Sequence, residues 1–181
     1  MPRYVVLLRG INVGGKNKVS MAALKQCVEG LGCSRVSTLL ASGNIVLDST
    51  KNAAALQGQI EKALPQSFKL DSELIRVLVL SRAKFRAMVI AKPHGFGEQP
   101  NKYHSDAIFL MGIAASKTMK VFDPREGIDV VWPGKGVIYS QRLSAKRTKS
   151  RLSRIVADPA YKSMTIRSWQ TTLKLFEMLD R

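Results

Sequence analysis

The sequence predicts an α+β fold of two tandem ferredoxin-like (split βαβ) halves with antiparallel sheets. Over residues 3–80, runs of β-forming apolar residues alternate with helical apolar spacing in the order β-α-β-β-α-β. A stretch rich in Pro and Gly follows at 92–104, and a similar order of elements then begins again. We therefore expect an N-terminal half with a connecting helix at 1–91, a linker at 92–104 and a C-terminal half at 105–181.

Local signals define the elements of the first half. Ser20 is a suitable N-cap for the helix that follows it, and Gly32 can close that helix. The turn residues 41–44 predict a hairpin, and Pro65 is expected to stop the second helix. The expected elements are a strand at 4–8, a helix at 21–31, strands at 36–40 and 45–47, a helix at 52–64, a strand at 74–80 and a helix at 81–91.

The second half repeats this order with a short last strand. Pro133-Gly-Lys-Gly136 predicts its hairpin turn. The expected elements are a strand at 107–111, a short helix at 114–121, strands at 128–132 and 137–141, a helix at 146–156, a strand at 164–166 and a closing helix at 168–179.

The charge predicts an anionic partner. The 181 residues hold 29 Lys and Arg against 13 Asp and Glu, a net charge of +16. Such a balance attracts nucleic acid or a phosphorylated ligand. The longest stretch without a charged residue, 36–47, is too short to span a membrane, and the N-terminus lacks the pattern of a signal peptide. We expect a cytoplasmic protein without a membrane partner, and the sequence carries no indication of its oligomeric state.

The first candidate site follows from topology. The first two strands of a split βαβ sheet run parallel, so the loop at 10–19, the turn at 42–44 and the loop at 66–72 should converge at one end. Glycines allow backbone N–H groups to point inward around an anion, and nearby cations can add charge. The ligand-binding residues expected here are Arg9, Gly10, Asn12, Gly14, Gly15, Lys16, Lys18, Ser42 and Asn44.

The second candidate site is a basic stretch at 142–154. On a helix, Arg147, Arg151 and Arg154 would lie on one face, at spacing i, i+4 and i+7. Together with Lys149 they would form a cationic stripe suited to phosphate contacts. A solvated outer face is the alternative interpretation.

No motif assigns a reaction. The sequence lacks the nucleophile, metalloprotease and nucleotide-loop patterns, and its two Cys and two His do not have the spacing of a metal site. No cofactor is indicated and the catalytic residues stay unknown. Besides anion binding, two hypotheses remain: an enzyme acting on a small phosphorylated or carboxylated metabolite between the halves, and motifs that only fix loops.

Four segments resemble the bacterial domain-of-unknown-function family numbered sixteen ninety-seven, and the similarity spans essentially the whole chain. The segments are LLRGINVGGKNKVSMAALK at 7–25, SGN at 42–44, KSRL at 149–152 and TIRSWQTTLKL at 165–175. The resemblance implies an α+β protein of ferredoxin-like halves, without an established activity. The chain departs from the family pattern at Ser168 and Gln170, where asparagines are expected. Both candidate sites coincide with family motifs, which favours a functional role for them.

Overall fold

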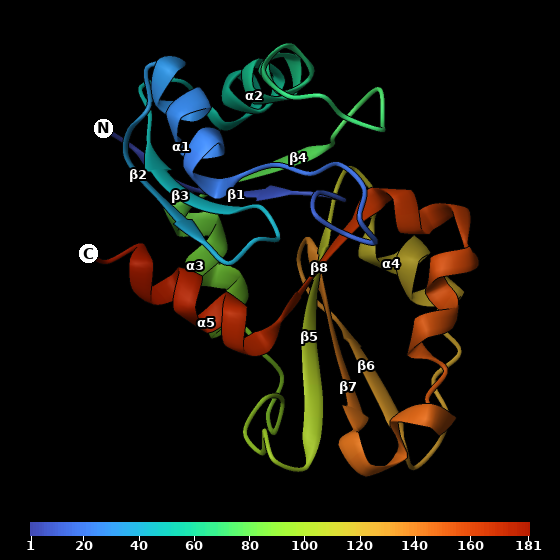
Figure 1. The fold of residues 1–181 in the computed structure, drawn as a ribbon. Coiled ribbons are helices and arrows are strands. Elements are labelled where there is room, and N and C mark those ends of the chain that lie inside the picture. The colour runs from blue at the N-terminus through green and yellow to red at the C-terminus, as the bar shows by residue number, and fades with distance from the viewer. The chain divides into compact units, whose positions relative to one another are not determined.

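The structure is a computed structural model that describes all 181 residues (Figure 1). The first half contains β1 (Arg3–Leu8), α1 (Met21–Gly30), β2 (Ser34–Leu39), β3 (Asn44–Asp48), α2 (Ala53–Ser67), β4 (Val77–Ser81) and α3 (Arg82–Ile90). The second half contains β5 (Tyr103–Leu110), α4 (Ala115–Thr118), the 3₁₀ helix η1 (Met119–Val121), β6 (Asp129–Pro133), β7 (Val137–Leu143), the 3₁₀ helices η2 (Ser144–Lys149), η3 (Leu152–Ala157) and η4 (Pro159–Ser163), β8 (Met164–Ser168) and α5 (Trp169–Met178).

The strands form two four-stranded antiparallel sheets with the same strand order. The first sheet has the order β2-β3-β1-β4, and the second has β6-β7-β5-β8. In each sheet the first strand of the half lies between the third and the fourth, which is the ferredoxin-like arrangement. The predicted fold class is therefore confirmed.

The residues gather into two compact units whose boundaries fall inside helices. Residues 1–86 and 175–181 form the first unit, and residues 87–174 form the second. The C-terminal residues belong to the first unit because the carboxylate of Asp180 pairs there with two arginines, Arg82 at 2.6 Å and Arg86 at 2.7 Å. The limits 1–91, 92–104 and 105–181 stay a prediction about which segments fold independently.

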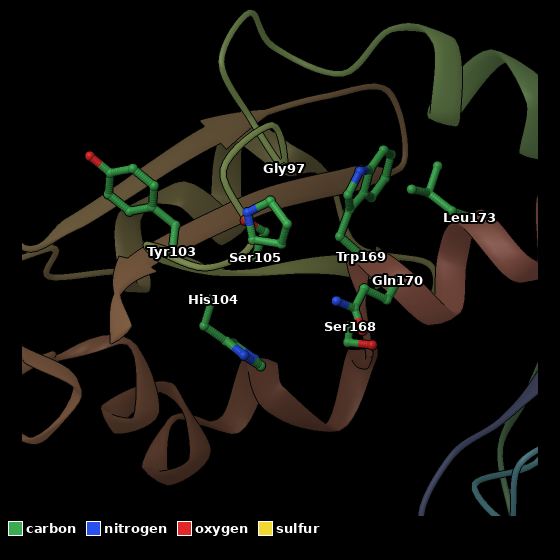
Figure 2. Close-up of a pocket in the computed structure, with 9 residues that line it drawn as sticks. Gly97, Tyr103, His104, Ser105, Ser168, Trp169, Gln170 and Leu173 are labelled. Atoms are coloured by element: carbon green, nitrogen blue, oxygen red, sulfur yellow. The ribbon is translucent and has the colours of Figure 1, made fainter. Parts of the chain in front are cut away.

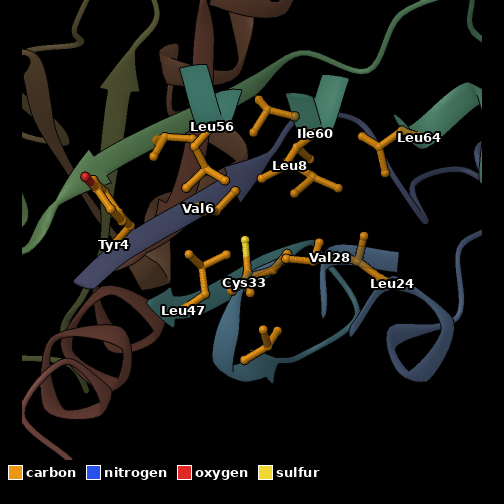
Figure 3. Packing of buried hydrophobic residues seen from close by; sticks show 14 of the residues in the cluster. Tyr4, Val6, Leu8, Leu24, Val28, Cys33, Leu47, Leu56, Ile60 and Leu64 are labelled. Atoms are coloured by element: carbon orange, nitrogen blue, oxygen red, sulfur yellow. The ribbon is translucent and has the colours of Figure 1, made fainter. Parts of the chain in front are cut away.

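Both faces of the first sheet are covered. Side chains alternate along a strand, so Tyr4, Val6 and Leu8 of β1 point together toward α1 and α2 (Figure 3). The helices contribute buried Leu24, Val28, Leu56, Ile60 and Leu64 to the same cluster. Val5 and Leu7 are also fully buried, on the other face of the strand. The central strand of this unit is thus enclosed on both faces.

The helix ends follow local rules with one difference. The side-chain oxygens of Ser20 and Asn52 accept N–H bonds at the starts of α1 and α2. The expectation that Pro65 stops α2 is wrong, because the helix continues past residue 64 to Ser67. Pro65 cannot donate to the carbonyl four residues earlier, but the backbone keeps its helical course and the N–H of Phe68 still bonds to the carbonyl of Leu64.

The second sheet has a core on each face. On one face Ile108, Leu110 and Ile138 pack with Ile155 of η3. On the other face Phe96 is completely buried and meets three aromatic rings edge to face, at centroid distances of 5.2 Å to Tyr139, 5.0 Å to Trp169 and 5.9 Å to Trp132. Phe96 lies in the segment 92–104 that joins α3 to β5, so this segment contributes to the core of the second unit.

The helix predicted over 146–156 is wrong. Residues 144–149 and 152–157 form 3₁₀ helices, separated by an extended Ser150 with φ −64° and ψ 145°. In an α-helix the N–H of Arg151 would bond to the carbonyl of Arg147. Here it donates to the carboxylate of Asp129 at 2.8 Å, while the N–H of Ser150 bonds to Arg147. A carboxylate distant in sequence therefore sets this backbone.

None of the helices combines the length and the apolar character needed to cross a membrane.

Candidate functional site

Three loops of the first unit meet at one end of its sheet, as the strand order predicts. The side-chain amide of Asn12 donates to the carbonyl of Ala41 at 2.8 Å, which joins the loop 9–19 to the β2–β3 turn. The side-chain oxygen of Asn17 accepts the N–H of Ser72 at 3.0 Å, which joins the same loop to the segment before β4. We call residues 9–19 the glycine loop. Its convergence with the other two loops is confirmed.

The tip of the glycine loop is a miniature hairpin. The N–H of Asn12 donates to the carbonyl of Asn17, and the N–H of Lys16 donates to the carbonyl of Val13, each at 3.1 Å. Gly14 and Gly15 have φ values of +59° and +77°, as a type I′ turn requires. The glycines therefore serve a tight reversal of the chain.

The two asparagines hold this hairpin to the rest of the unit. The amide of Asn12 bonds to both backbone groups of Val19, accepting its N–H at 2.8 Å and donating to its carbonyl at 2.9 Å. Asn17 is 5% exposed, and its amide donates to the carbonyl of Gly10 at 2.9 Å. Their amide groups are used within the protein, which supports a structural role for this part of the motif.

The β2–β3 turn is fitted tightly beneath the glycine loop. The carbonyl of Gly43 accepts the N–H of Leu8 at 2.8 Å. A Cβ atom on Gly43 would lie 2.7 Å from Cβ of Leu8, so only glycine fits. Asn44 is fully buried, and its amide donates to the carbonyl of Leu39 and the hydroxyl of Ser42. Ser42 and Asn44 thus shape the turn.

Four backbone N–H groups of the glycine loop are used within the protein, and those of Gly10, Gly14 and Gly15 are not among them. The N–H groups of Asn12, Lys16, Asn17 and Val19 all donate to acceptors within the unit, because the loop closes on itself as a hairpin. The loop also offers its side chains to a ligand. Lys16 and Lys18 are exposed and form no ion pair.

In the second unit, residues 144–154 form what we call the basic segment. Asp129, 5% exposed, accepts the N–H of Arg151 at 2.8 Å and the N–H of Arg125 at 3.0 Å. Burial opposes its ionisation, but these N–H donors and the hydroxyl of Ser150 together hold the pKa of Asp129 below its usual value. A buried, ionised carboxylate thus fixes the middle of the basic segment.

The cations of the basic segment fall into two groups. Arg151 and Arg154 both reach the carboxylate of Asp123, at 3.0 Å and 3.3 Å, so their charge is partly compensated. Lys146, Arg147 and Lys149 are exposed and form no ion pair. The 3₁₀ geometry therefore replaces the predicted stripe by one paired cluster and one free cluster.

The predicted site residues are thus divided between the units. Arg9, Gly10, Asn12, Gly14, Gly15, Lys16, Lys18, Ser42 and Asn44 lie at one end of the first unit, and Arg147, Lys149, Arg151 and Arg154 lie in the second. Within each unit, the predicted site residues of that unit lie close to one another.

The sequence-based prediction missed a pocket of about 210 Å³ in the second unit. Figure 2 shows it at the start of β5, where β8 ends and α5 begins. It is lined by Gly97, Pro100, Tyr103, His104, Ser105, Ser168, Trp169, Gln170 and Leu173. The TIRSWQTTLKL motif contains four of these residues and is the sequence signal that could have indicated it. We call it the β5 pocket.

Titratable groups are sparse around the β5 pocket. The ring nitrogen Nε2 of His104 lies 3.1 Å from the carboxylate of Asp106, and Arg142 lies 3.8 Å from the same carboxylate. Burial raises the pKa of Asp106, although His104 and Arg142 oppose the shift. No group of three or more His, Cys, Asp and Glu side chains is placed to hold a metal ion.

The family model of DUF1697, a protein of unknown function, matches residues 1–139. The chain belongs to the DUF1697 family. Among solved structures, the conserved bacterial protein SP0830 from Streptococcus pneumoniae is 28% identical, with a TM-score of 0.82, and the match covers 100% of this chain and 99% of that chain. No curated protein matches the sequence.

The two comparisons cover different parts of the candidate sites. The DUF1697 match includes the glycine loop and the β2–β3 turn, but it ends before the basic segment and before Trp169. The likeness to SP0830 extends over the whole chain, so both halves of the fold are shared with that protein.

Proposed function

We propose that this protein binds nucleic acid through phosphate contacts made by the basic segment. The observation that carries the proposal is the free cluster of Lys146, Arg147 and Lys149. These three side chains lie within four residues, are exposed, and have no carboxylate within ion-pair distance. Cations clustered without acidic partners are the footprint of a polyanion-binding surface.

The backbone beneath this cluster is held in place. The N–H of Ser144 donates to the carbonyl of Lys102 at 3.0 Å, which ties the start of the basic segment to the start of β5. Asp129 holds its middle through the N–H of Arg151. Fixed cations lose less entropy on binding than cations on a mobile tail, which favours affinity.

Each unit carries further exposed cations. Lys102 precedes β5, and its ammonium lies 5.1 Å from the centre of the Tyr103 ring. In the first unit, Lys16 and Lys18 offer a second group of free cations. Phosphate contacts of this kind position a nucleic acid without reading its sequence. We therefore propose binding with little sequence preference, in which Arg9, Lys16 and Lys18 add phosphate contacts.

Salt dependence tests the proposal. Fluorescence anisotropy of a labelled single-stranded oligonucleotide, titrated at several salt concentrations, gives the slope of log K against log salt. Each neutralised phosphate contributes about −0.7 to that slope on single strands. The triple variant Lys146→Ala, Arg147→Ala, Lys149→Ala removes three cations, so we expect its slope to be smaller in magnitude by about 2.

A matched triple variant controls for net charge. Lys51, Lys62 and Lys84 are exposed residues of the first unit without ion pairs, and their replacement by alanine removes the same charge elsewhere. We expect this variant to keep most of the wild-type slope. Equal losses in the two triple variants, or no binding at low salt, would contradict the proposal.

A further inference from the structure

The β5 pocket exists because two neighbouring strands differ in length. The pairing of β5 with β8 ends at Asp106 and Ser168, while β5 continues back to Tyr103 with β7 alone as its neighbour. Residues 103–105 therefore have a strand on one side only. The chain turns from β8 into α5 at this point, which leaves a notch in the sheet, seen in Figure 2.

The lining of the notch suits an uncharged ligand. No lysine, arginine, aspartate or glutamate lines it. Gln170 supplies an amide that can donate and accept, and Leu173 and Pro100 supply apolar surface. The hydroxyls of Ser105 and Ser168 are already bonded to Gln141 and Thr171. Small-molecule sites typically combine apolar walls with a few placed polar groups.

One polar group in the wall lacks a partner in the protein. Trp169 is 5% exposed, its indole nitrogen Nε1 makes no hydrogen bond within the chain, and this nitrogen still reaches solvent. Indole offers a donor only, so an acceptor atom on a ligand would complete it. A buried tryptophan usually finds such an acceptor. The indole N–H can therefore donate to a ligand that carries a hydrogen-bond acceptor on an otherwise apolar body.

The walls of the pocket are fixed before any ligand arrives. Trp169 packs edge to face against Phe96 at 5.0 Å, and Gly97 lies so close that an added Cβ would be 2.3 Å from the indole Cδ1. The side-chain oxygen of Gln141 accepts from the N–H of Gly97 at 3.1 Å and from the hydroxyl of Ser105 at 2.9 Å. One buried amide thus joins two walls, and such pre-organisation favours binding.

The pocket adjoins the basic segment within the same unit. Tyr103, a lining residue, pairs with Leu143, the last residue of β7, and the basic segment begins at the next residue, Ser144. A nucleic acid held by its phosphates at 144–149 carries two kinds of uncharged group, its sugars and its bases, and only the bases have apolar faces. Bases are planar, have apolar faces and present acceptors along their edges.

We propose that the β5 pocket receives an unstacked nucleobase of a single-stranded nucleic acid bound at the basic segment. This inference rests on the proposed function and adds a base-binding subsite to it. The indole N–H of Trp169 donates to a ring acceptor of the base. The amide of Gln170 contacts its edge, and Leu173 covers one of its faces.

The indole resonance of Trp169 reports directly on the pocket. The chain has two tryptophans, so a ¹⁵N–¹H spectrum shows two indole signals, and Trp132→Phe identifies the one from Trp169. Titration with uncharged nucleosides, and separately with the single-stranded oligonucleotide, should shift this signal. Inorganic phosphate, which has no base, should leave it in place.

A charged substitution at the rim gives the matched test. Leu173, 37% exposed, lines the pocket, whereas Ile90, 69% exposed, is an aliphatic residue of α3 outside it. Leu173→Glu should weaken oligonucleotide binding roughly tenfold or more, the loss expected for one base contact. Ile90→Glu carries the same change of charge and should weaken binding much less.

The outcomes separate the two proposals. Salt-dependent oligonucleotide binding with an unmoved Trp169 signal, or with equal affinities for Leu173→Glu and Ile90→Glu, would overturn the base pocket and leave the proposed function standing. A nucleoside-induced shift without oligonucleotide binding would overturn the proposed function and the nucleic-acid source of the base. Shifts with both ligands, together with the loss in Leu173→Glu, would support the inference.

Discussion

Asn17 and Asp71 bind each other reciprocally across two loops. The backbone N–H of Asn17 donates to the carboxylate of Asp71 at 2.6 Å, and the backbone N–H of Asp71 donates to the side-chain oxygen of Asn17 at 2.9 Å. The two residues lie 54 positions apart in the sequence. Because each satisfies a backbone donor of the other, two reciprocal hydrogen bonds hold the base of the glycine loop.

Asn17→Ala should destabilise the protein by about 2–3 kcal/mol, because it removes several hydrogen bonds from a buried site. The loss is to be measured as the free energy of unfolding in a denaturant titration. Lys18→Ala, at the exposed neighbouring position, should stay within about 0.5 kcal/mol of the wild type. Equal stabilities of Asn17→Ala and Lys18→Ala would refute the structural role of this asparagine.

Gly43→Ala should lower the free energy of unfolding by more than the strained backbone angle of alanine alone explains. Its φ of +75° is unfavourable for alanine, and the new Cβ would also lie 2.7 Å from Leu8 and 2.9 Å from Ile11. Gly15 has a similar φ of +77° with open space around it, so Gly15→Ala isolates the backbone cost, about 1 kcal/mol. We expect Gly43→Ala to lose about 1–3 kcal/mol more in thermal or chemical unfolding. Similar losses in both variants would contradict this packing argument.

Asp129→Asn should destabilise the second unit at neutral pH. The N–H donors hold the pKa of Asp129 below 3.8, so its carboxylate stabilises the fold above that pH and loses this effect as the pH falls through the folded-state value. Replacing a charged acceptor by a neutral one should cost about 1–2 kcal/mol. The free energy of unfolding should be measured over a series of acidic pH values. The difference in this free energy between variant and wild type should become smaller as the pH falls. A constant difference would argue against the charge as its cause.

Asp106→Asn should change stability in the opposite direction to Asp129→Asn. Burial raises the pKa of Asp106 above 3.8, so the ionised carboxyl costs stability, and this cost grows as the pH rises through the folded-state value. His104 and Arg142 reduce the cost without cancelling it. The variant should therefore be at least as stable as the wild type at neutral pH, with its advantage shrinking toward pH 3.8. Lower stability of the variant across the whole range would show that the ion pairs outweigh burial.

Lys16→Ala and Lys18→Ala should affect binding and leave stability unchanged. Both side chains are exposed and form no ion pair, so each replacement should shift the free energy of unfolding by less than about 0.5 kcal/mol. If the glycine loop adds phosphate contacts, the double variant lowers the magnitude of the salt slope by about 1.4 on single strands. An unchanged slope would confine the phosphate contacts to the second unit.

Much of the fold was predictable because its signals are local. Ser20 and Asn52 mark helix starts through bonds to backbone groups three residues later, and the continuous apolar run Tyr4–Leu8 marks a buried strand. The strand order then follows from the β-α-β-β-α-β sequence of elements. The convergence of the three loops in the first unit follows from that order, and it did not require any side-chain detail.

Features that depend on partners distant in sequence could not be predicted from the sequence. The basic segment has the spacing of an amphipathic helix, yet Asp129, 22 residues from Arg151, takes an N–H that an α-helix would use. The glycine loop has the composition of an anion cradle, yet the N–H groups of Asn17 and Val19 donate to the side chains of Asp71 and Asn12. In both cases the composition alone does not determine the backbone conformation, because acceptors supplied by other residues decide which N–H groups are used.

The sequence by itself determined the two ferredoxin-like halves, the positions of most elements and the excess of positive charge. The tertiary structure alone decided which cations are free, which amides are used internally and where a pocket opens. The physical reason is the sequence separation of the interacting residues, because helix caps and apolar strand patterns act over only a few residues. The notch beside Trp169 arises instead from a difference in length between β5 and β8, two strands that pair only after the chain has folded.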